Sequence, residues 1–201
     1  MNATIAFERD NLVVDFGALV SRVSDEEFSE FCRLNPELRI ERTSQGDLII
    51  MPPTGGLTGA QNFELIGQFR VWVKHSGTGK GFDSSTVFSL PNGAKRSPDL
   101  SWVSNESWQA LTPEEQAEFP PLCPDFVVEL RSRTDALKNL KAKMEEYLEN
   151  GARLGWIIDP IDRKFYVYRP GMTLQVLDNP QTVSGTPLLK GFVLDVRSLW
   201  E

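Results

Sequence analysis

Apolar residues recur at helical intervals in three stretches of the chain. The first, SDEEFSEFCRLN, opens with Ser24 and Glu27 at the spacing of a capping box. The second runs from about Gly59 to Lys74 and places its bulky residues near one face. The third, TDALKNLKAKMEEYLENG, carries a single apolar stripe, and Gly151 is its expected stop. The spacing therefore predicts three helices.

Short runs rich in β-branched and aromatic residues lie between these helices and after the last one, and they predict strands. LRIERT and DLIIMP, separated by three residues, predict a hairpin. KGFDSSTVFSL, DLSWV and FVVEL predict three more strands, and Asn92 with Gly93 marks a hairpin turn between the first two. LGWIID and FYVYRP predict a final pair of strands.

The order of these elements is that of an α/β fold. We expect FVVEL to be the central strand and to connect through the third helix to LGWIID, its parallel neighbour. The chain has 201 residues, no internal repeat and no long linker. We therefore expect one domain over residues 1–201.

Composition narrows the kinds of protein that the chain can be. Hydrophobic residues make up 40% of it, and no apolar stretch approaches the roughly 18 residues of a membrane span. The first residues lack the pattern of a secretory signal, so we expect a cytoplasmic protein. Cys32 and Cys123 are too few for a disulfide framework, and a single histidine, His75, excludes a His-rich zinc site. Any bound metal would therefore have oxygen ligands.

The net charge of −7 argues against a surface built throughout for coating nucleic acid, because phosphate binding needs concentrated lysine and arginine. A local basic cleft remains compatible with this charge. We expect a homodimer that gathers the basic residues of two copies into one groove.

Two strands that are otherwise suited to burial carry carboxylates. Strand alternation places Glu129 of FVVEL on the face opposite Phe126, Val128 and Leu130, and it places Asp99 of SPDLSWV opposite Leu100 and Trp102. Two like charges about 4 Å apart repel by about 4 kcal/mol at an effective dielectric constant near 20. A divalent cation such as Mg²⁺, which binds hard oxygen ligands, would remove this cost. Ion-paired structural residues are the alternative reading of the same pattern.

The helix that follows Glu129 supplies lysines on both sides of its apolar stripe. Lys141 and Lys143 lie at opposite edges of the stripe, with Lys143 alongside Leu140 and Tyr147. Either lysine could reach towards the carboxylates, and helical geometry alone does not choose between them.

Four segments taken together resemble a known family. MPPTGGLTG, SPDLSWV, PDFVVELRS and LKAKMEEYLENGARLGWIIDP resemble, in this order, the motifs of the Uma-two (putative restriction endonuclease) family, part of the PD-(D/E)XK nuclease superfamily. The resemblance runs from about Asp25 to Trp200. It implies a restriction-endonuclease-like three-layer core, with a mixed central sheet flanked by helices. An N-terminal helix and β-hairpin would extend this core.

The resemblance also implies roles for individual residues. Asp99, after Pro98, resembles the PD acid, and Glu129 resembles the acid of the (D/E)XK element, so both would be metal ligands. Arg131 stands where the motif has lysine, and the match to KMEEY selects Lys143 as the migrated lysine. Because arginine stays protonated, Lys143 is the better candidate for orienting or activating the attacking water. Glu64 on the second helix resembles an additional acidic ligand that some relatives use.

A second PD pair, Pro124 and Asp125, precedes Glu129 on the same strand. At about 3.3 Å per residue, Asp125 and Glu129 are about 13 Å apart and cannot share one ion. We expect Asp125 to stabilise the start of the strand by hydrogen bonds.

These inferences favour a metal-dependent endonuclease that hydrolyses DNA phosphodiester bonds with Mg²⁺ or Mn²⁺, with Arg131 or Arg133 contacting phosphate. One alternative is a nuclease-fold protein that has little or no turnover and acts as a nucleic-acid or protein interaction module. Another is a metal-dependent enzyme acting on a small phosphorylated molecule.

Overall fold

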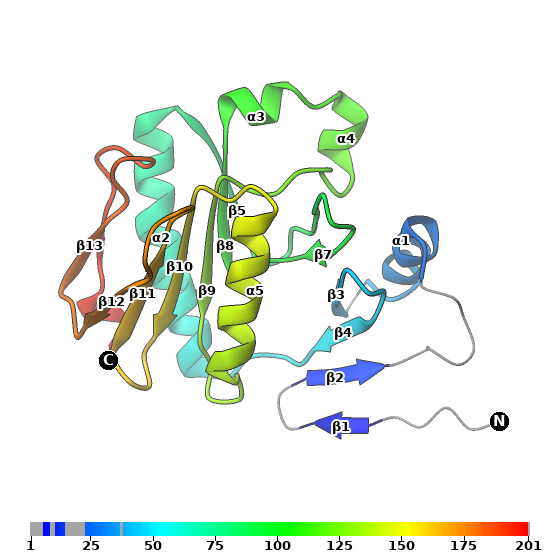
Figure 1. Ribbon diagram of the computed structural model, residues 1–201, viewed down its shortest axis with the longest axis horizontal. Helices are drawn as coiled ribbons and strands as arrows, with labels where there is room; N and C mark the ends of the chain where they lie inside the picture. Colours follow the sequence, from blue (N-terminus) through cyan, green and yellow to red (C-terminus); the bar gives the residue numbers. More distant parts are fainter. Residues whose placement is uncertain (1–5, 9–10, 15–22, 37, 201) are drawn as a thin grey trace.

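The computed structural model describes residues 6–8, 11–14, 23–36 and 38–200. Its centre is a mixed six-stranded sheet in the order β12-β11-β10-β9-β8-β5 (Figure 1). The strands of this sheet are β5 (Gly79–Asp83), β8 (Leu100–Ser104), β9 (Phe126–Leu130), β10 (Leu154–Asp159), β11 (Lys164–Tyr168) and β12 (Gln175–Asp178). β9 runs parallel to β10 and antiparallel to β8, so the strand that carries Glu129 is central, as predicted.

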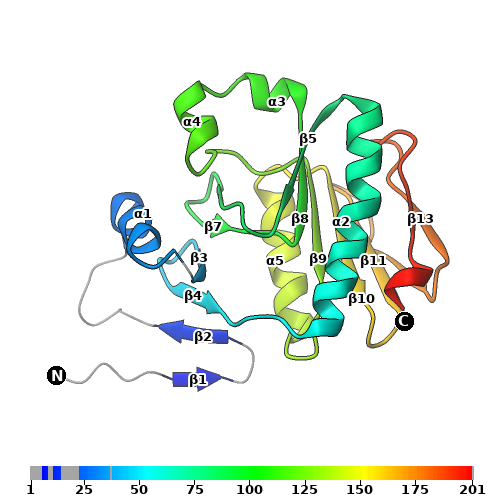
Figure 2. The same cartoon turned by 180° about the vertical axis from the view of Figure 1, so that it is seen from behind.

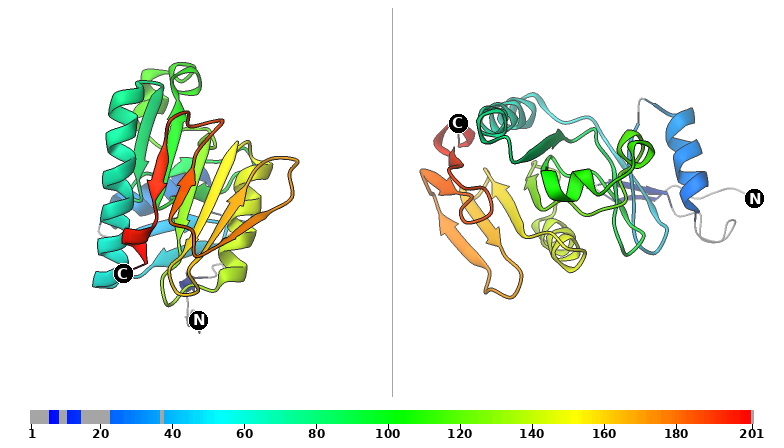
Figure 3. Two further views of the ribbon diagram at one scale, coloured as in Figure 1. Left: turned by 90° about the vertical axis from the view of Figure 1, so that its left-hand side faces the viewer. Right: turned by 90° about the horizontal axis from the view of Figure 1, so that it is seen from above.

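The two long helices cover opposite faces of this sheet (Figure 3). On one face, Leu65 and Phe69 of α2 (Gly56–Ser76) pack against apolar residues of β8 and β9. On the other face, Met144 and Tyr147 of α5 (Leu137–Glu149) pack against Val127 and its neighbours. The expected three-layer core is therefore present.

A second sheet lies beside this core, in the order β1-β2-β4-β3-β7-β6 (Figure 2). Its strands are β1 (Ala6–Glu8), β2 (Asn11–Val14), β3 (Arg39–Arg42), β4 (Leu48–Met51), β6 (Phe88–Ser89) and β7 (Lys95–Arg96). The helix α1 (Asp25–Leu34) buries Phe28 against Ile40 and Leu48 of this sheet. The predicted N-terminal helix, its capping box and the β3–β4 hairpin are thereby confirmed.

The remaining elements are short. They are α3 (Asn105–Gln109), α4 (Pro113–Ala117), β13 (Thr182–Ser184), β14 (Val193–Asp195) and the 3-10 helix η1 (Arg197–Leu199). The strands β13 and β14 pair with each other, and apolar residues from this C-terminal part join the core on the α2 face. No helix in the described part of the chain combines the length and the apolar character that crossing a membrane requires.

One strand prediction is wrong. KGFDSSTVFSL does not form a single strand, because Asp83 accepts hydrogen bonds from Ser85 and turns the chain between β5 and β6. The turn at Asn92 and Gly93 exists, with Gly93 at φ 88°, but it joins β6 to β7 in the second sheet. The segment before Asp99 is thus diverted through the second sheet before it enters β8.

Candidate active site

Asp99 and Glu129 meet across two neighbouring strands. The β8–β9 register pairs Leu100 with Val128, so the next pair brings Asp99 opposite Glu129. The backbone N–H of Leu130 donates to Oδ2 of Asp99 at 2.8 Å, which fixes the aspartate beside the strand that carries Glu129. The alternation predicted for both strands is confirmed, because their apolar residues pack under α2 and leave the acids on the α5 face.

Lys143 reaches the carboxylates from α5. Its Nζ lies 2.9 Å from Oε1 of Glu129 and 2.8 Å from Oε1 of Glu41. One turn further along the same helix, the hydroxyl of Tyr147 donates to Oε1 of Glu129 at 3.0 Å. The helix therefore presents both a cation and a hydroxyl donor to the same carboxylate oxygen.

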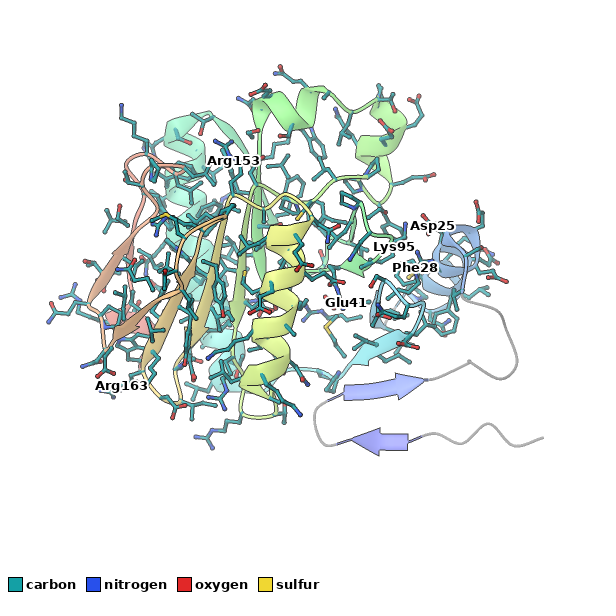
Figure 4. All side chains as sticks on the ribbon, in the orientation of Figure 1. Asp25, Phe28, Glu41, Lys95, Arg153 and Arg163 are labelled. Atoms are coloured by element: carbon teal, nitrogen blue, oxygen red, sulfur yellow. The ribbon has the colours of Figure 1, made fainter. Side chains whose placement is uncertain are left out.

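Glu41 is a member of the site that the sequence did not reveal. It comes from β3 of the second sheet and is only 2% exposed (Figure 4). The backbone N–H of Ser97 donates to its Oε1 at 2.8 Å, and Arg96 donates to its Oε2 at 3.1 Å. Arg96 also donates to Oε2 of Glu146 on α5 at 2.6 Å. One signal of this part of the site was present in the sequence, namely adjacent charged residues in each of two short strands, Glu41–Arg42 and Lys95–Arg96.

Burial raises the pKa values of both predicted metal ligands. Burial raises the pKa of Glu129 to about 7; Lys143 opposes this shift, and the charges of Asp99 and Glu41 add to it. Burial likewise raises the pKa of Asp99, although the N–H of Leu130 lowers it in part. Two buried carboxylates in this position are thus under-compensated by positive charge from the protein.

Glu41 and Lys143 behave as an ionised pair. Burial raises the pKa of Glu41, but Lys143 and Arg96 outweigh it and bring that pKa below its ordinary value. Burial lowers the pKa of Lys143, yet the charges of Glu129 and Glu41 together hold it above its ordinary range. Lys143 therefore keeps its proton at neutral pH, and its chemistry here is that of a fixed cation and hydrogen-bond donor.

The donor set fits a divalent cation bound by two carboxylates. Two carboxylate oxygens, Oδ1 of Asp99 and Oε2 of Glu129, accept no hydrogen bond from the described residues. Neither of these oxygens is fully buried. Mg²⁺ is often held by one or two carboxylates, with water and phosphate oxygens at its other positions. The described residues contain no group of three acidic, histidine or cysteine side chains arranged to hold a metal.

Glu64 is not brought to this pair. It lies on α2, which covers the opposite face of the sheet, and its exposed side chain accepts a hydrogen bond from Gln68 at 3.0 Å. The sheet itself separates Glu64 from the face on which Glu129 lies.

Three other residues singled out in the sequence have local partners. Arg131 pairs with Asp159 at 2.7 Å and with Asp162 at 3.0 Å, so its guanidinium is already engaged beside the site. Lys141 lies over the ring of Tyr166 at 4.7 Å, away from the carboxylates. Asp125 accepts a hydrogen bond from the backbone N–H of Ser104 at 2.9 Å, as expected of a residue that stabilises the start of β9.

A comparison with protein families identifies the family of this chain. The model of the Uma2 (Uma-two) family, described as "Putative restriction endonuclease", matches residues 25–197, which include Asp99, Glu129 and Lys143. The chain belongs to this family. A comparison with curated proteins found none that matches this Uma2 chain.

A solved structure shares the fold of this Uma2 protein. It is the crystal structure of a putative nuclease belonging to DUF820 from Anabaena variabilis, with a TM-score of 0.68 and 23% sequence identity. The match covers 80% of this chain and 89% of the other. The Uma2 protein therefore has a nuclease-like fold, and what its own site does is argued next.

Proposed function

We propose that this protein is a metal-dependent endonuclease that acts in the cytoplasm and hydrolyses phosphodiester bonds of DNA. The observation that carries the proposal is the convergence of Asp99 and Glu129 from two neighbouring strands, with Lys143 at 2.9 Å from Glu129. Membership of a family described as "Putative restriction endonuclease" supports the choice of nucleic acid as substrate.

Asp99 and Glu129 would hold Mg²⁺, or Mn²⁺ in its place, through the two carboxylate oxygens that accept no hydrogen bond from the part of the chain that the structure describes. When bound, such an ion polarises a phosphoryl oxygen and lowers the pKa of a bound water. Lys143 carries a positive charge next to Glu129, where it can orient a water molecule and stabilise charge that develops on the phosphate.

Glu41 and Tyr147 position these groups. Glu41 accepts from Lys143 and is itself fixed by Ser97 and Arg96, so the ammonium group is held between two carboxylates. Tyr147 fixes Oε1 of Glu129, and Oε2 accepts no hydrogen bond from any residue that the structure describes. The result is a preorganised arrangement, which is the main requirement for stabilising charge in a transition state.

The first prediction concerns nicking of supercoiled plasmid in the presence of Mg²⁺. We expect Glu129→Gln and Asp99→Asn each to reduce the nicking rate by about 100-fold or more, the size of effect seen when one group that stabilises transition-state charge is removed. Asp125→Asn is the matched control, because Asp125 directly precedes β9 but lies outside the site, where it accepts a hydrogen bond from the N–H of Ser104. Circular dichroism would show that each variant folds.

Unchanged Mg²⁺-dependent nicking in Glu129→Gln would contradict the proposal. A second readout separates an enzyme from an interaction module that keeps only the fold. An ion at 100 times its dissociation constant should stabilise the wild type by about 2.7 kcal/mol, and Asp99→Asn should lose this stabilisation. An interaction module without a metal site would show no such shift.

The interaction-module alternative has one specific observation in its favour. Lys143 pairs with Glu129 and Glu41, and Arg96 pairs with Glu41 and Glu146. Such a continuous ion-pair network can be purely structural. The two readings differ in metal binding, which the stabilisation measurement reports directly.

We also propose a homodimer, because one copy with a net charge of −7 offers little positive charge to a duplex. Sedimentation of the metal-free protein at increasing concentration tests this assembly without involving cleavage.

A further inference from the structure

A polar hollow lies at the edge of the main sheet where β10 and β12 end. It has a volume of about 290 Å³ and is lined by Arg163, Asn179, Pro180, Gln181, Arg197 and Trp200. These residues come from the β10–β11 turn, the segment after β12, and the C-terminal 3-10 helix. Figure 4 places Arg163 at the lower edge of the molecule, at the end of the sheet.

The strand ends that border the hollow lie at the same end of the main sheet as Glu129, while Trp200 packs on the α2 face. Glu129 pairs with Ile157 in the parallel β9–β10 ladder, and β10 ends two residues later, at Asp159. The chain then turns through Arg163, and Lys164 pairs with Asp178 just before Asn179. β11 and β12 lie two and three strands from β9, which is roughly 10 to 14 Å across the sheet at about 4.8 Å per strand. Arg163 lies three residues before Tyr166, which is level with Glu129, and this adds about 10 Å along the strand at about 3.3 Å per residue. The hollow is therefore roughly 14 to 17 Å from Glu129.

The lining of the hollow has a positive charge and side-chain hydrogen-bonding groups that have no partners among the described residues. Arg163 forms no ion pair with any residue that the structure describes, and the side-chain amides of Asn179 and Gln181 form no hydrogen bonds there. Arg197 pairs with Asp195, with its Nε 2.9 Å from Oδ1. Two guanidinium groups and one carboxylate leave a local positive charge on a protein whose total charge is negative.

The backbone at this place favours glycine, yet it carries larger side chains. Arg163 has φ 49° and Asn179 has φ 45°, both in the left-handed region. The two residues are joined by the hydrogen bond from Asn179 N–H to Arg163 O at 2.8 Å. Asparagine tolerates this conformation, but arginine is uncommon in it. The arginine at position 163 therefore serves something other than the stability of the turn.

We propose that this hollow binds a phosphate of the nucleic-acid backbone, several nucleotides from the bond that is cut. The inference rests on the proposed function and adds a contact to it. Guanidinium and amide N–H groups match the oxygens of a phosphodiester in geometry and charge. Phosphates of one strand follow each other at about 3.4 Å along the duplex axis, so the distance to Glu129 corresponds to roughly four or five nucleotides.

A second arginine-lined hollow offers a contrast within the same molecule. Arg153, Arg169 and four other residues line about 180 Å³ beyond the start of β10 (Figure 4). There Arg153 lies 3.4 Å from the carboxylate of Asp125, and Arg169 donates to the carbonyl oxygen of Thr186 at 3.3 Å. Both arginines have partners, and the hollow lies at the edge away from Glu129.

The test is the salt dependence of duplex binding, measured by fluorescence anisotropy with EDTA present so that metal-dependent cleavage does not interfere. Each lost phosphate contact lowers the slope of log affinity against log salt by about 0.9. We expect this decrease, and about tenfold weaker binding at low salt, for Arg163→Gly and for Arg197→Gln. Because glycine suits the left-handed backbone, Arg163→Gly should melt at the wild-type temperature or above it.

Arg169→Gln is the matched control, since it removes the same charge from the other hollow, and its slope should equal that of the wild type. A wild-type slope for Arg163→Gly, an equal loss for Arg169→Gln, or a wild type that binds no duplex would each overturn the inference. If the slope falls as expected while no variant or wild type nicks DNA, the proposed function fails and the phosphate contact stands. If the wild type nicks DNA and the slope for Arg163→Gly equals that of the wild type, the proposed function stands and the phosphate contact fails.

Discussion

At the scale of one residue, Glu129 is an ionisable group in a buried position, where its charge costs stability. Its residue is 4% exposed, its strand is otherwise apolar, and the positive charge of Lys143 is shared with Glu41. Replacing such a carboxylate with a neutral group of the same shape should help the folded state, because it removes the cost of burying a charge. A residue kept at this cost is a candidate for function.

The raised pKa of Glu129 determines the pH range in which this cost lowers the stability of the folded protein. In the unfolded chain the carboxyl titrates near 4.5, and in the folded protein burial raises the pKa to about 7. Below 4.5 the group is protonated in both states, and above 7 it is ionised in both. The folded state therefore loses stability as the pH rises from 4.5 to 7, by up to the order of 3 kcal/mol.

We expect Glu129→Gln to gain stability relative to the wild type between pH 5 and pH 8, because glutamine does not ionise. Urea unfolding in EDTA at several pH values measures the difference. Asp125→Asn again serves as the control. A difference between Glu129→Gln and the wild type that stays constant over this range would show that Glu129 does not titrate in the window.

Single residues were predicted well where a fixed period decided their position. Strand alternation put Asp99 and Glu129 on the correct face because the period of two is rigid. Helical geometry left Lys141 and Lys143 open, and only the resemblance selected Lys143, which the structure places 2.9 Å from Glu129. Glu41 could not be predicted, since its place depends on the long-range pairing of β3 with β7.

At the scale of elements, the close approach of α5 to the sheet determines where Lys143 lies. Gly155 of β10 faces Met144 of α5, and a Cβ at Gly155 would lie 2.2 Å from Sδ of Met144. Met144 is fully buried and is the direct neighbour of Lys143. The absence of a side chain at Gly155 thus lets the helix pack closely enough to bring its lysine to the carboxylates.

We expect Gly155→Ala to destabilise the protein by about 1 to 3 kcal/mol, because it overpacks this contact. Met144→Ala should cost about 2 to 5 kcal/mol alone through the cavity it leaves. The double variant should be more stable than the sum of the two changes predicts by about 1 kcal/mol or more, since each change accommodates the other. Urea unfolding of the four proteins provides the measurement.

Gly67→Ala is the control for this cycle. A Cβ at Gly67 meets nothing within 4 Å on the exposed face of α2, so alanine should stabilise the helix by roughly 0.5 to 1 kcal/mol. Additive effects of Gly155→Ala and Met144→Ala would mean that the two positions do not share a contact.

The elements themselves were predicted where their signals were local. The capping box of α1, the stripe of α5 and the β9–α5–β10 connection follow from residues close together in sequence. The division of KGFDSSTVFSL between two sheets was missed, because an apolar run does not record which sheet its residues join. The short helices α3 and α4 were missed because five residues are too few for a periodic pattern.

At the scale of the whole molecule, Arg96 ties the second sheet to the main one. It belongs to β7, and its guanidinium joins Glu41 of β3 to Glu146 of α5. Both carboxylates are poorly exposed, so removing the arginine leaves two buried charges with reduced compensation. The docking of the second sheet should therefore depend on this one side chain more than on exposed ion pairs.

We expect Arg96→Met to lower the free energy of unfolding by about 3 to 5 kcal/mol, the usual cost of breaking a buried pair. Amide hydrogen exchange should speed up in β3 and β4 well before β9 and β10. Arg33→Met, which removes an exposed pair with Glu30, should cost at most about 1 kcal/mol. Equal exchange in both sheets of Arg96→Met would show that the second sheet is held in another way.

The order of the site residues along the chain also matters during synthesis. A ribosome releases Glu41, Asp99 and Glu129 before Lys143, and it releases β10, which flanks Glu129 on its other side, after Lys143. A nascent chain that has emerged only through β9 has the acids but neither the ammonium group nor the strand that completes their surroundings. Under the proposed function, cleavage of nucleic acid would therefore require that both α5 and β10 have emerged.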